Sequence, residues 1–363
     1  MLMDDTVILA TSREQCVKKL EVVLEFCSQS GMVLNQAKTK FMVINAAPDD
    51  RNPIAIFFEG KMFNIDWCDS YVYLGSIFTT DGKIFSAIQN CAMDAKKHFM
   101  KFVTFLNKNP DYPFFVKHKV MNSAFLAAIL YGCEGWLIDN IAPMNKLYIS
   151  SIKALLAVRQ TTSNDACLLE LGYPPLKYWV KERQYQFFKS AISRRTSIHD
   201  DPLMFAITLA KGARTKAGQY LIGLLDGGDY FKVGINVLKD TVANSTRSKL
   251  IAYQTMNPEL DVHGIYRQRQ PIIPEHQRMA FTRLRLVSHR LRIETGRWAR
   301  IPQEERLCIC GEVQTERHVV CDCELSRNIR DLNPHMTFRF PNFFFNMNSD
   351  ICRVVYDILQ LYM

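Results

Sequence analysis

The strongest constraint on the fold of this chain is a change in hydrophobic periodicity near residue 83. Before that point, short apolar and β-branched runs are separated by turn signals, at residues 7–9, 40–44, 54–58, 61–65 and 72–77. After it, apolar residues recur at helical spacing over residues 83–106, 113–131, 143–158, 176–195, 229–256 and 275–295. A period of two indicates strands, and a period near 3.6 indicates helices. We therefore predict an α+β protein, mostly helical, whose small antiparallel sheet lies within residues 1–82.

Three local signals refine the first region. Ser12 begins a capping box, and Gly31 is a natural end for the helix that follows it. Glu59-Gly60 stands between two strand runs and predicts a hairpin. Gly75 lies inside the last strand run, where a glycine can mark the close approach of another backbone, such as a primer strand. The alternative for that segment is an ordinary core strand.

The composition is that of a globular protein, with 48% hydrophobic residues and a formal net charge of +9. A positive charge suits a polyanionic partner without requiring one. No run of about 18 apolar residues occurs, so we expect no membrane span. The N-terminus lacks the basic and apolar regions of a secretory signal. We therefore expect an intracellular protein, in the nucleus and/or the cytoplasm.

Asp4 and Asp5 form an acidic pair directly before the apolar run at 7–9. Hard cations such as Mg²⁺ prefer oxygen ligands, and a pair of carboxylates at a hairpin tip can hold the metals of a polymerase. The alternative is a solvated turn or a frayed terminus.

Tyr73, two residues before Gly75, is with that glycine a candidate contact for nucleic acid. Lys38 lies in the segment Gly31–Lys40. A lysine beside a carboxylate–metal site can contact a triphosphate or protonate the departing pyrophosphate. The alternative is an ordinary connection with a solvated lysine.

An arginine-rich stretch spans residues 278–300 and includes a single acidic residue, Glu294. Leucines interleave with the arginines, so we predict an amphipathic basic helix suited to a phosphate backbone. The candidate contacts are Arg283, Arg285, Arg290, Arg292 and Arg297. The alternative is a solvated helix face paired with nearby acids such as Glu304 and Glu305.

Four of the eleven cysteines cluster near the C-terminus, and the others lie mostly singly. That distribution indicates a reducing compartment and a metal site rather than a disulfide framework. Cys308, Cys310, His318 and Cys323 can close a tetrahedral Zn²⁺ site, with Cys321 competing for the last position. The alternative is a reduced, cysteine-rich loop.

Taken in order, these segments resemble the LINE-type (non-LTR) retrotransposon reverse transcriptases. Leu2-Met3-Asp4-Asp5 resembles their YADD box, with Leu2 and Met3 in place of Tyr-Ala. The segment 31–40 resembles GxxLNxxKTK, and Tyr73-Leu74-Gly75-Ser76 with Asp81-Gly82 resembles YLGS…DG. Residues 130–136 resemble the LYGCExW block, and residues 296–323 resemble the GRW…CxCG knuckle.

The resemblance implies a domain order and an activity. It predicts a polymerase palm remnant at 1–82, a helical thumb at 83–160, a helical linker with the basic helix at 161–300, a CCHC zinc knuckle at 301–330 and a C-terminal tail helix at 331–363. It implies RNA-directed DNA synthesis, with Mg²⁺ at Asp4 and Asp5, structural Zn²⁺ in the knuckle, and RNA and DNA as partners.

In this family a third metal-binding aspartate and the fingers lie upstream of the YADD box. We therefore expect this chain to be inactive alone, unless another chain completes the palm. Two alternatives stay open: a non-catalytic nucleic-acid-binding zinc-knuckle protein, and a decayed remnant without function. Salt-sensitive binding favours the first of these, and poor solubility the second.

Overall fold

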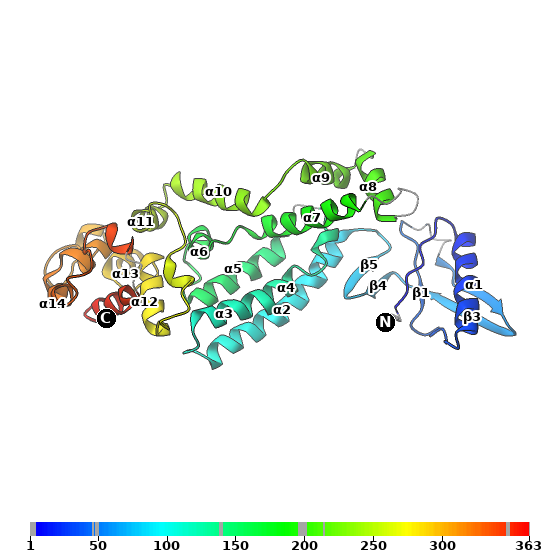
Figure 1. Cartoon of the computed structure of the whole chain (residues 1–363), viewed down its shortest axis with the longest axis horizontal. Coiled ribbons are helices and arrows are strands. Elements are labelled where there is room, and N and C mark those ends of the chain that lie inside the picture. Colours follow the sequence, from blue (N-terminus) through cyan, green and yellow to red (C-terminus); the bar gives the residue numbers. More distant parts are fainter. Residues whose placement is uncertain are drawn as a thin grey trace. The chain divides into compact units, whose positions relative to one another are not determined.

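The computed structural model describes residues 5–45, 47, 51–137, 141–194, 202–212, 215–345 and 349–362. The chain divides into two compact units, an N-terminal unit (residues 1–93) and a C-terminal unit (residues 94–363) (Figure 1). Strands β1 to β5 all lie in the N-terminal unit, and the described part of the C-terminal unit is built mainly from helices. The prediction of a mostly helical chain with a small sheet near its start is confirmed.

Helix α1 (Arg13–Gln29) supplies one side of the core of the N-terminal unit. The Ser12 side chain accepts a hydrogen bond from the Gln15 backbone N–H at 3.2 Å, and Gly31, with φ +65°, follows the last turn. Both predicted helix ends are therefore confirmed. The apolar face of α1 packs against the strands that follow, and the buried residues of this core are Leu20, Leu24, Phe41, Ile54, Ile56 and Ile65.

The three-stranded sheet has the order β1-β3-β2. Strands β2 (Ile54–Phe58) and β3 (Lys61–Trp67) form the predicted hairpin, with Ile54 opposite Ile65. Both turn residues, Glu59 and Gly60, have positive φ, as a tight two-residue hairpin turn requires. Strand β1 (Lys40–Phe41) pairs with β3 in parallel, so this sheet is mixed rather than wholly antiparallel as predicted.

The run at residues 72–77 is not the single strand that we predicted. It is the turn region of a second hairpin, formed by β4 (Ser70–Tyr73) and β5 (Ser76–Thr79). Leu74 and Gly75 both have positive φ, +47° and +77°, so the glycine serves the turn.

The run at 7–9 is not a strand either, because it lacks a partner strand within the described residues. Ile8 instead packs against the α1 core, and Lys19 Nζ donates to the Leu9 carbonyl oxygen at 2.8 Å.

The helices between residues 84 and 193 follow the predicted spans closely. They are α2 (Ile84–Lys108), α3 (Phe114–Val120), the π-helical turn Met121–Leu126, α4 (Ala127–Ile129), α5 (Ala142–Leu156), α6 (Asn164–Leu171) and α7 (Leu176–Ser193). Helix α6 was missed, because it is only eight residues long and apolar on most sides. The later helices are α8 (Pro202–Gly212), α9 (Lys216–Leu225), α10 (Tyr230–Ala243), α11 (Ser248–Met256), α12 (Glu275–Arg285), α13 (Arg292–Trp298), α14 (Arg327–Asp331) and α15 (Asp350–Gln360).

Two long helices of the prediction are each divided. The segment 229–256 breaks between α10 and α11, and the segment 275–295 breaks between α12 and α13. At the second break Val287 adopts φ +51°, a conformation that a helix cannot contain. The predicted single basic helix is therefore two helices joined by a turn.

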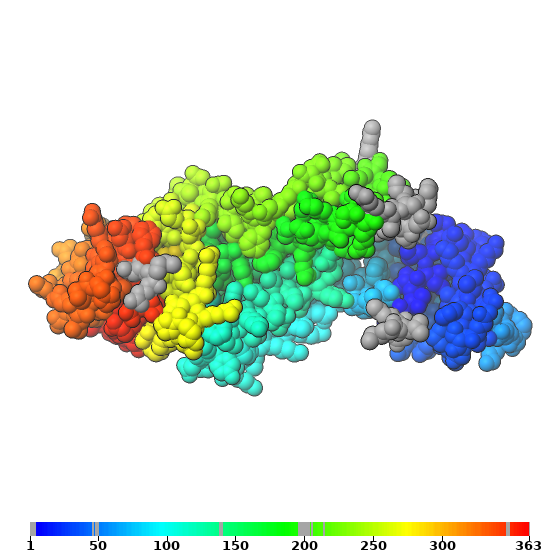
Figure 2. Space-filling model, viewed as in Figure 1, coloured from blue at the N-terminus to red at the C-terminus, as the bar shows by residue number. Residues whose placement is uncertain are grey.

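Buried charged side chains of the C-terminal unit are paired with one another. Glu275 of α12 accepts hydrogen bonds from Lys117 and Arg278, and all three side chains are buried. Helix α15 packs against α12 and closes this core. In the space-filling view the red C-terminal segment lies against the yellow segment that contains α12 (Figure 2). Among the described residues, none of the helices combines the length and apolar character needed to span a membrane.

Candidate metal centre and nucleic-acid interface

Four metal-binding side chains of the C-terminal unit converge on one point. One donor atom from each of Cys308, Cys310, His318 and Cys323 lies within 4.8 Å of the other three. Cys323 Sγ is 3.8 Å from both Cys308 Sγ and Cys310 Sγ, and Cys310 Sγ is 3.2 Å from His318 Nε2. Sulfur ligands of a tetrahedral Zn²⁺, each at about 2.3 Å from the ion, lie about 3.8 Å apart. The cluster is therefore shaped to bind a metal ion.

Two short backbone motifs build this cluster. Cys308 and Cys310 flank a tight turn, in which the Cys308 N–H donates to the Glu312 carbonyl at 2.6 Å and Gly311 has φ +95°. His318 begins a π-helical turn, and the Cys323 N–H donates to the His318 carbonyl at 2.7 Å. This wider turn places residues five apart on the same side of the chain.

The sequence left Cys321 and Cys323 as alternatives for the fourth ligand. In the structure Cys323 belongs to the cluster and Cys321 lies outside it. Burial, helped by the neighbouring Asp322 carboxylate, raises the pKa of the Cys321 thiol to about 11. Burial also acts to raise the pKa of Cys308, but hydrogen bonds from the Cys310 backbone and from neighbouring side chains outweigh it and lower that pKa. The thiolate is the metal-binding form, so the raised pKa of Cys321 makes that thiol a poorer ligand.

Some arginines of the arginine-rich stretch are buried in ion pairs, and others are exposed. Arg285 is only 2% exposed, and its Nε lies 2.8 and 3.0 Å from the two carboxylate oxygens of Glu170. A guanidinium that is buried in an ion pair with both carboxylate oxygens belongs to the interior of the fold and cannot reach a nucleic acid. The prediction that Arg285 contacts nucleic acid is therefore wrong. Arg278 is buried in the same way against Glu275.

The remaining arginines face outward to different degrees. Arg283, Arg290 and Arg292 are exposed, and Arg297 is half-buried with its Nη1 3.0 Å from a Glu294 oxygen. Arg283 also donates from Nε to the Ala157 carbonyl at 2.9 Å. Within the described chain, Glu304 and Glu305 form no ion pair with these arginines, so the alternative of a paired, solvated face is not realised through them.

The metal cluster and the arginine segment are joined by hydrogen bonds. Gln314, between the two ligand pairs, accepts from the Arg292 N–H at its side chain (2.6 Å) and from the Ile293 N–H at its carbonyl (3.3 Å). Buried His289 contacts Glu316 at 2.8 Å. The loop that holds the cysteines therefore also positions the segment that carries Arg290 and Arg292.

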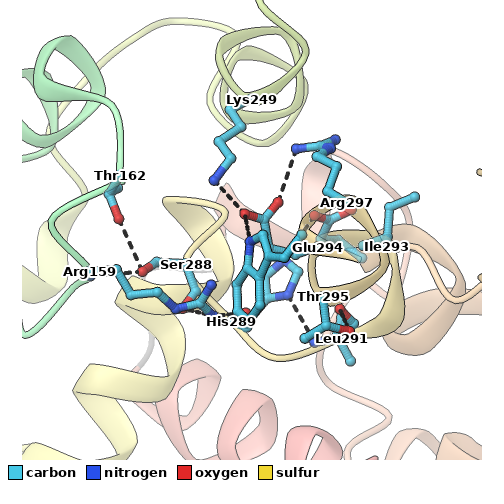
Figure 3. Close-up of polar contacts among 12 residues, drawn as sticks. Arg159, Thr162, Lys249, Ser288, His289, Leu291, Ile293, Glu294, Thr295 and Arg297 are labelled. Carbon is cyan, nitrogen blue, oxygen red and sulfur yellow. Dashed lines mark hydrogen bonds and ion pairs between the residues drawn. The ribbon is translucent and has the colours of Figure 1, made fainter. Parts of the chain in front are cut away.

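Arg159 contacts the arginine-rich stretch from another part of the chain, and it was not among the predicted site residues. It follows α5, some 130 residues before the arginine segment, so no local pattern could reveal it. Its guanidinium donates to the Ser288 carbonyl at 3.0 Å, and its Cζ lies 4.0 Å from the centre of the Trp298 ring. Figure 3 shows Arg159 reaching Ser288 and His289.

The predicted polymerase residues lie in the N-terminal unit. Asp4 lies outside the described residues. Asp5 is exposed, and its backbone carbonyl accepts a hydrogen bond from the Tyr73 hydroxyl at 3.4 Å. Lys38 is also exposed, and its carbonyl accepts from Tyr71 at 3.2 Å. Strand β4 thus contacts the backbone of both segments. Among the described residues, Asp5 does not belong to a group of three metal-binding side chains.

Comparison with known proteins gives an independent result for this unit. Residues 1–78 match the family model of reverse transcriptase (RNA-dependent DNA polymerase). The reverse transcriptase match contains Asp4, Asp5, Lys38, Tyr73 and Gly75, and it ends within β5. No curated protein matches the chain. Reverse transcriptase domains bind nucleic acids and use divalent metals, so the match supports both properties for the N-terminal unit.

Proposed function

We propose that this chain is the C-terminal part of a reverse transcriptase from a non-LTR, LINE-type retrotransposon. The observation that carries the proposal is the match of residues 1–78 to the reverse transcriptase model. The order of the later motifs, through the cysteine cluster, supports the LINE type. The five proposed parts are the palm remnant at 1–82, thumb at 83–160, linker at 161–300, zinc knuckle at 301–330 and tail at 331–363. An intracellular location, in the nucleus and/or the cytoplasm, belongs to the same proposal.

Asp4 and Asp5 hold Mg²⁺ in this proposal, and Lys38 contacts the triphosphate. Phosphoryl transfer depends on metal ions held by several carboxylates, because charge stabilisation and positioning supply nearly all of the rate. Among the described residues, Asp5 is not part of a group of three metal-binding side chains. In this proposal the chain polymerises only when a further polypeptide segment supplies another metal ligand and the fingers.

Zn²⁺ is the metal that fits the cysteine cluster. Three sulfur atoms and one imidazole nitrogen are soft ligands, and a closed set of four in tetrahedral spacing is typical of a structural zinc site. The loop around it is short and buries few apolar side chains, among them Val319 and Val320, so the metal supplies part of its folding energy. The loop in turn holds Arg290 and Arg292 in place for template RNA or target DNA.

Primer extension on an RNA template tests the polymerase part of the proposal. We expect no extension by the chain alone, and extension once the chain is supplied with the upstream polymerase segment. Asp5→Asn should abolish that activity. Asp5-dependent extension by the chain alone would contradict the requirement for a further segment, and no extension in either state would contradict the polymerase assignment.

Salt dependence tests the nucleic-acid interface. Each lost phosphate contact on a single strand reduces the slope of log affinity against log salt by about 0.7. The variant Arg290→Ala/Arg292→Ala should therefore lower the slope by about 1.4. Arg327→Ala, an exposed arginine of α14, is the matched control and should leave the slope unchanged. Equal slopes for all three proteins would remove this interface.

A further inference from the structure

Trp298 is a large aromatic side chain left open to solvent. The chain has four tryptophans, and Trp298, at the end of α13, is the exposed one, with 53% of the residue's surface accessible. A single exposed aromatic residue is common and needs no explanation by itself. What distinguishes Trp298 is that its neighbours fix the ring in one position.

Two contacts hold the indole in place. Its Nε1 donates to a Glu294 oxygen at 3.3 Å, which fixes the ring's rotation in its own plane. The Arg159 guanidinium lies over the ring with Cζ 4.0 Å from the centroid, which supports one face. Glu294 is completely buried and is itself fixed by ion pairs with Lys249 and Arg297 (Figure 3). A ring that is already ordered loses little conformational entropy when it binds a partner.

Positive charge gathers around this ring. Burial lowers the pKa of Arg159; the Glu294 carboxylate opposes that effect, and the nearby charges of Arg290 and Arg283 lower the pKa further. Contacts place both arginines near Arg159. Arg283 donates from Nε to the carbonyl of Ala157, two residues before Arg159, and Arg290 directly follows His289, whose carbonyl accepts from the Arg159 guanidinium. The carboxylate beside them, Glu294, already pairs with Lys249 and Arg297. The surface thus has an excess of positive charge that a negatively charged partner would neutralise.

We propose that Trp298 is a stacking platform for an unpaired base of a single-stranded nucleic acid, with Arg283 and Arg290 contacting the adjacent phosphates. This inference rests on the proposed nucleic-acid function and specifies the form of its ligand. Bases in a duplex have their faces covered by their neighbours, whereas an unpaired base offers a free face to an aromatic side chain. Arg159 beneath the ring and a base above it would form a three-layer stack.

The test measures the binding of a short labelled oligonucleotide by the full chain, with its metal bound, at low salt. Four ligands are used: single-stranded RNA, single-stranded DNA of the same sequence, the RNA duplex, and the single strand with abasic positions. The variants are Trp298→Ala and Trp298→Phe, with Tyr112→Ala as a control at another half-exposed aromatic residue. Circular dichroism melting verifies that each variant is folded.

We expect Trp298→Ala to weaken single-strand binding by roughly tenfold or more, while Trp298→Phe keeps most of the affinity. Abasic positions should weaken binding by the unmodified chain but not by Trp298→Ala. Comparison of RNA with DNA then identifies which of the two is the better ligand. Tryptophan fluorescence should be quenched on binding, and Trp298→Phe should lose that component.

Two results would overturn the inference, and they differ from a failure of the proposed function. In the first, the chain binds single strands strongly while Trp298→Ala, or the abasic positions, leave that affinity unchanged. This result would contradict the stacking platform but not nucleic-acid binding. Equal losses in folded Trp298→Ala and Trp298→Phe would assign the effect to the Glu294 hydrogen bond instead of stacking. If the unmodified chain binds none of the four ligands, the nucleic-acid function itself fails, and the platform with it.

Discussion

The acidic segment of the N-terminal unit and the cysteine cluster of the C-terminal unit are both candidate metal sites, but they differ in completeness. The cysteine cluster brings four donor atoms within 4.8 Å of one another, and two of its thiols are buried. Asp5 is exposed and is not joined by two further ligands among the described residues. The family match covers the incomplete site, whereas the complete one lies outside that match.

The two sites are therefore supported by different observations, the first by a family match and the second by the geometry of its side chains. A family model can match a segment whose described residues do not form a complete metal site. A metal centre held by its own loop can be recognised from geometry without any relative. If the two units differ in this way, changes at the cysteine cluster should alter metal content and stability far more than a change at Asp5 does.

Removal of the metal should have the largest effect. Cys308→Ser should lower the zinc content from about one ion per chain to near zero and unfold the loop around the cluster, because a structural zinc site supplies much of the folding energy of a small segment. Zinc analysis and limited proteolysis measure both changes. Cys321→Ser, the matched control outside the cluster, should keep the metal. Equal zinc loss in the two variants would contradict the ligand set.

Breaking a buried ion pair should come second. Arg285→Met leaves the Glu170 carboxylate buried without its guanidinium partner, and we expect the free energy of unfolding to fall by about 3–5 kcal/mol. Urea denaturation measures this change. Arg290→Met is the control at an exposed arginine and should change stability by less than about 0.5 kcal/mol. Similar losses for both would mean that Arg285 is not the structural member of the arginine-rich stretch.

A smaller effect should appear as pH falls. Burial lowers the pKa of His118 below its usual 6.5, and its Nε2 lies 2.6 Å from the Tyr173 hydroxyl. Because the folded-state pKa is the lower one, the unfolded chain takes up a proton first. The stabilising contribution of neutral His118 is thus complete above about pH 6.5 and is lost as pH falls through the folded-state value.

Urea midpoints at pH 7.5 and 5.5 measure this dependence. His118→Asn should reduce the difference between the two midpoints, and His98→Asn, at an exposed histidine of α2, should leave it as it is. Taking differences between variants cancels the pH dependence of metal binding. An unchanged difference in His118→Asn would contradict the prediction.

The smallest effect is expected at Asp5. Because its side chain is exposed, Asp5→Asn should leave both the zinc content and the urea midpoint of the chain unchanged, within about 0.5 kcal/mol. A marked loss of stability would mean that Asp5 has a structural role. The effect of Asp5 on stability would then no longer differ from that of the cysteine ligands.

Features decided by neighbouring residues could be predicted from the sequence. The Ser12 cap, the Glu59-Gly60 hairpin and the spacing of Cys308 and Cys310 each depend on a few adjacent positions. Gly75 was misread for a related reason, because a glycine in an apolar run is compatible with either a strand or a turn. The positive φ of the preceding Leu74, which decides between them, is not visible in the sequence.

Features decided by distant residues could not be predicted. Arg285 resembles its exposed neighbour Arg283 in the sequence, but it pairs with Glu170, which lies 115 positions earlier. Arg159 reaches the Trp298 ring from a different part of the chain in the same way. Nothing in the arginine-rich stretch itself separates the residues that stabilise the fold from those that can contact a ligand.

The hydrogen bonds of Gln314 have a consequence for how the metal and a nucleic acid would influence each other. Gln314 lies in the cysteine loop and holds the backbone of Arg292 and Ile293. If the metal tightens nucleic-acid binding through this residue, thermodynamic reciprocity requires a bound strand to raise the affinity of the cysteines for the metal by the same factor. A bound strand would then stabilise the metal centre, and loss of the metal would weaken the binding of the strand.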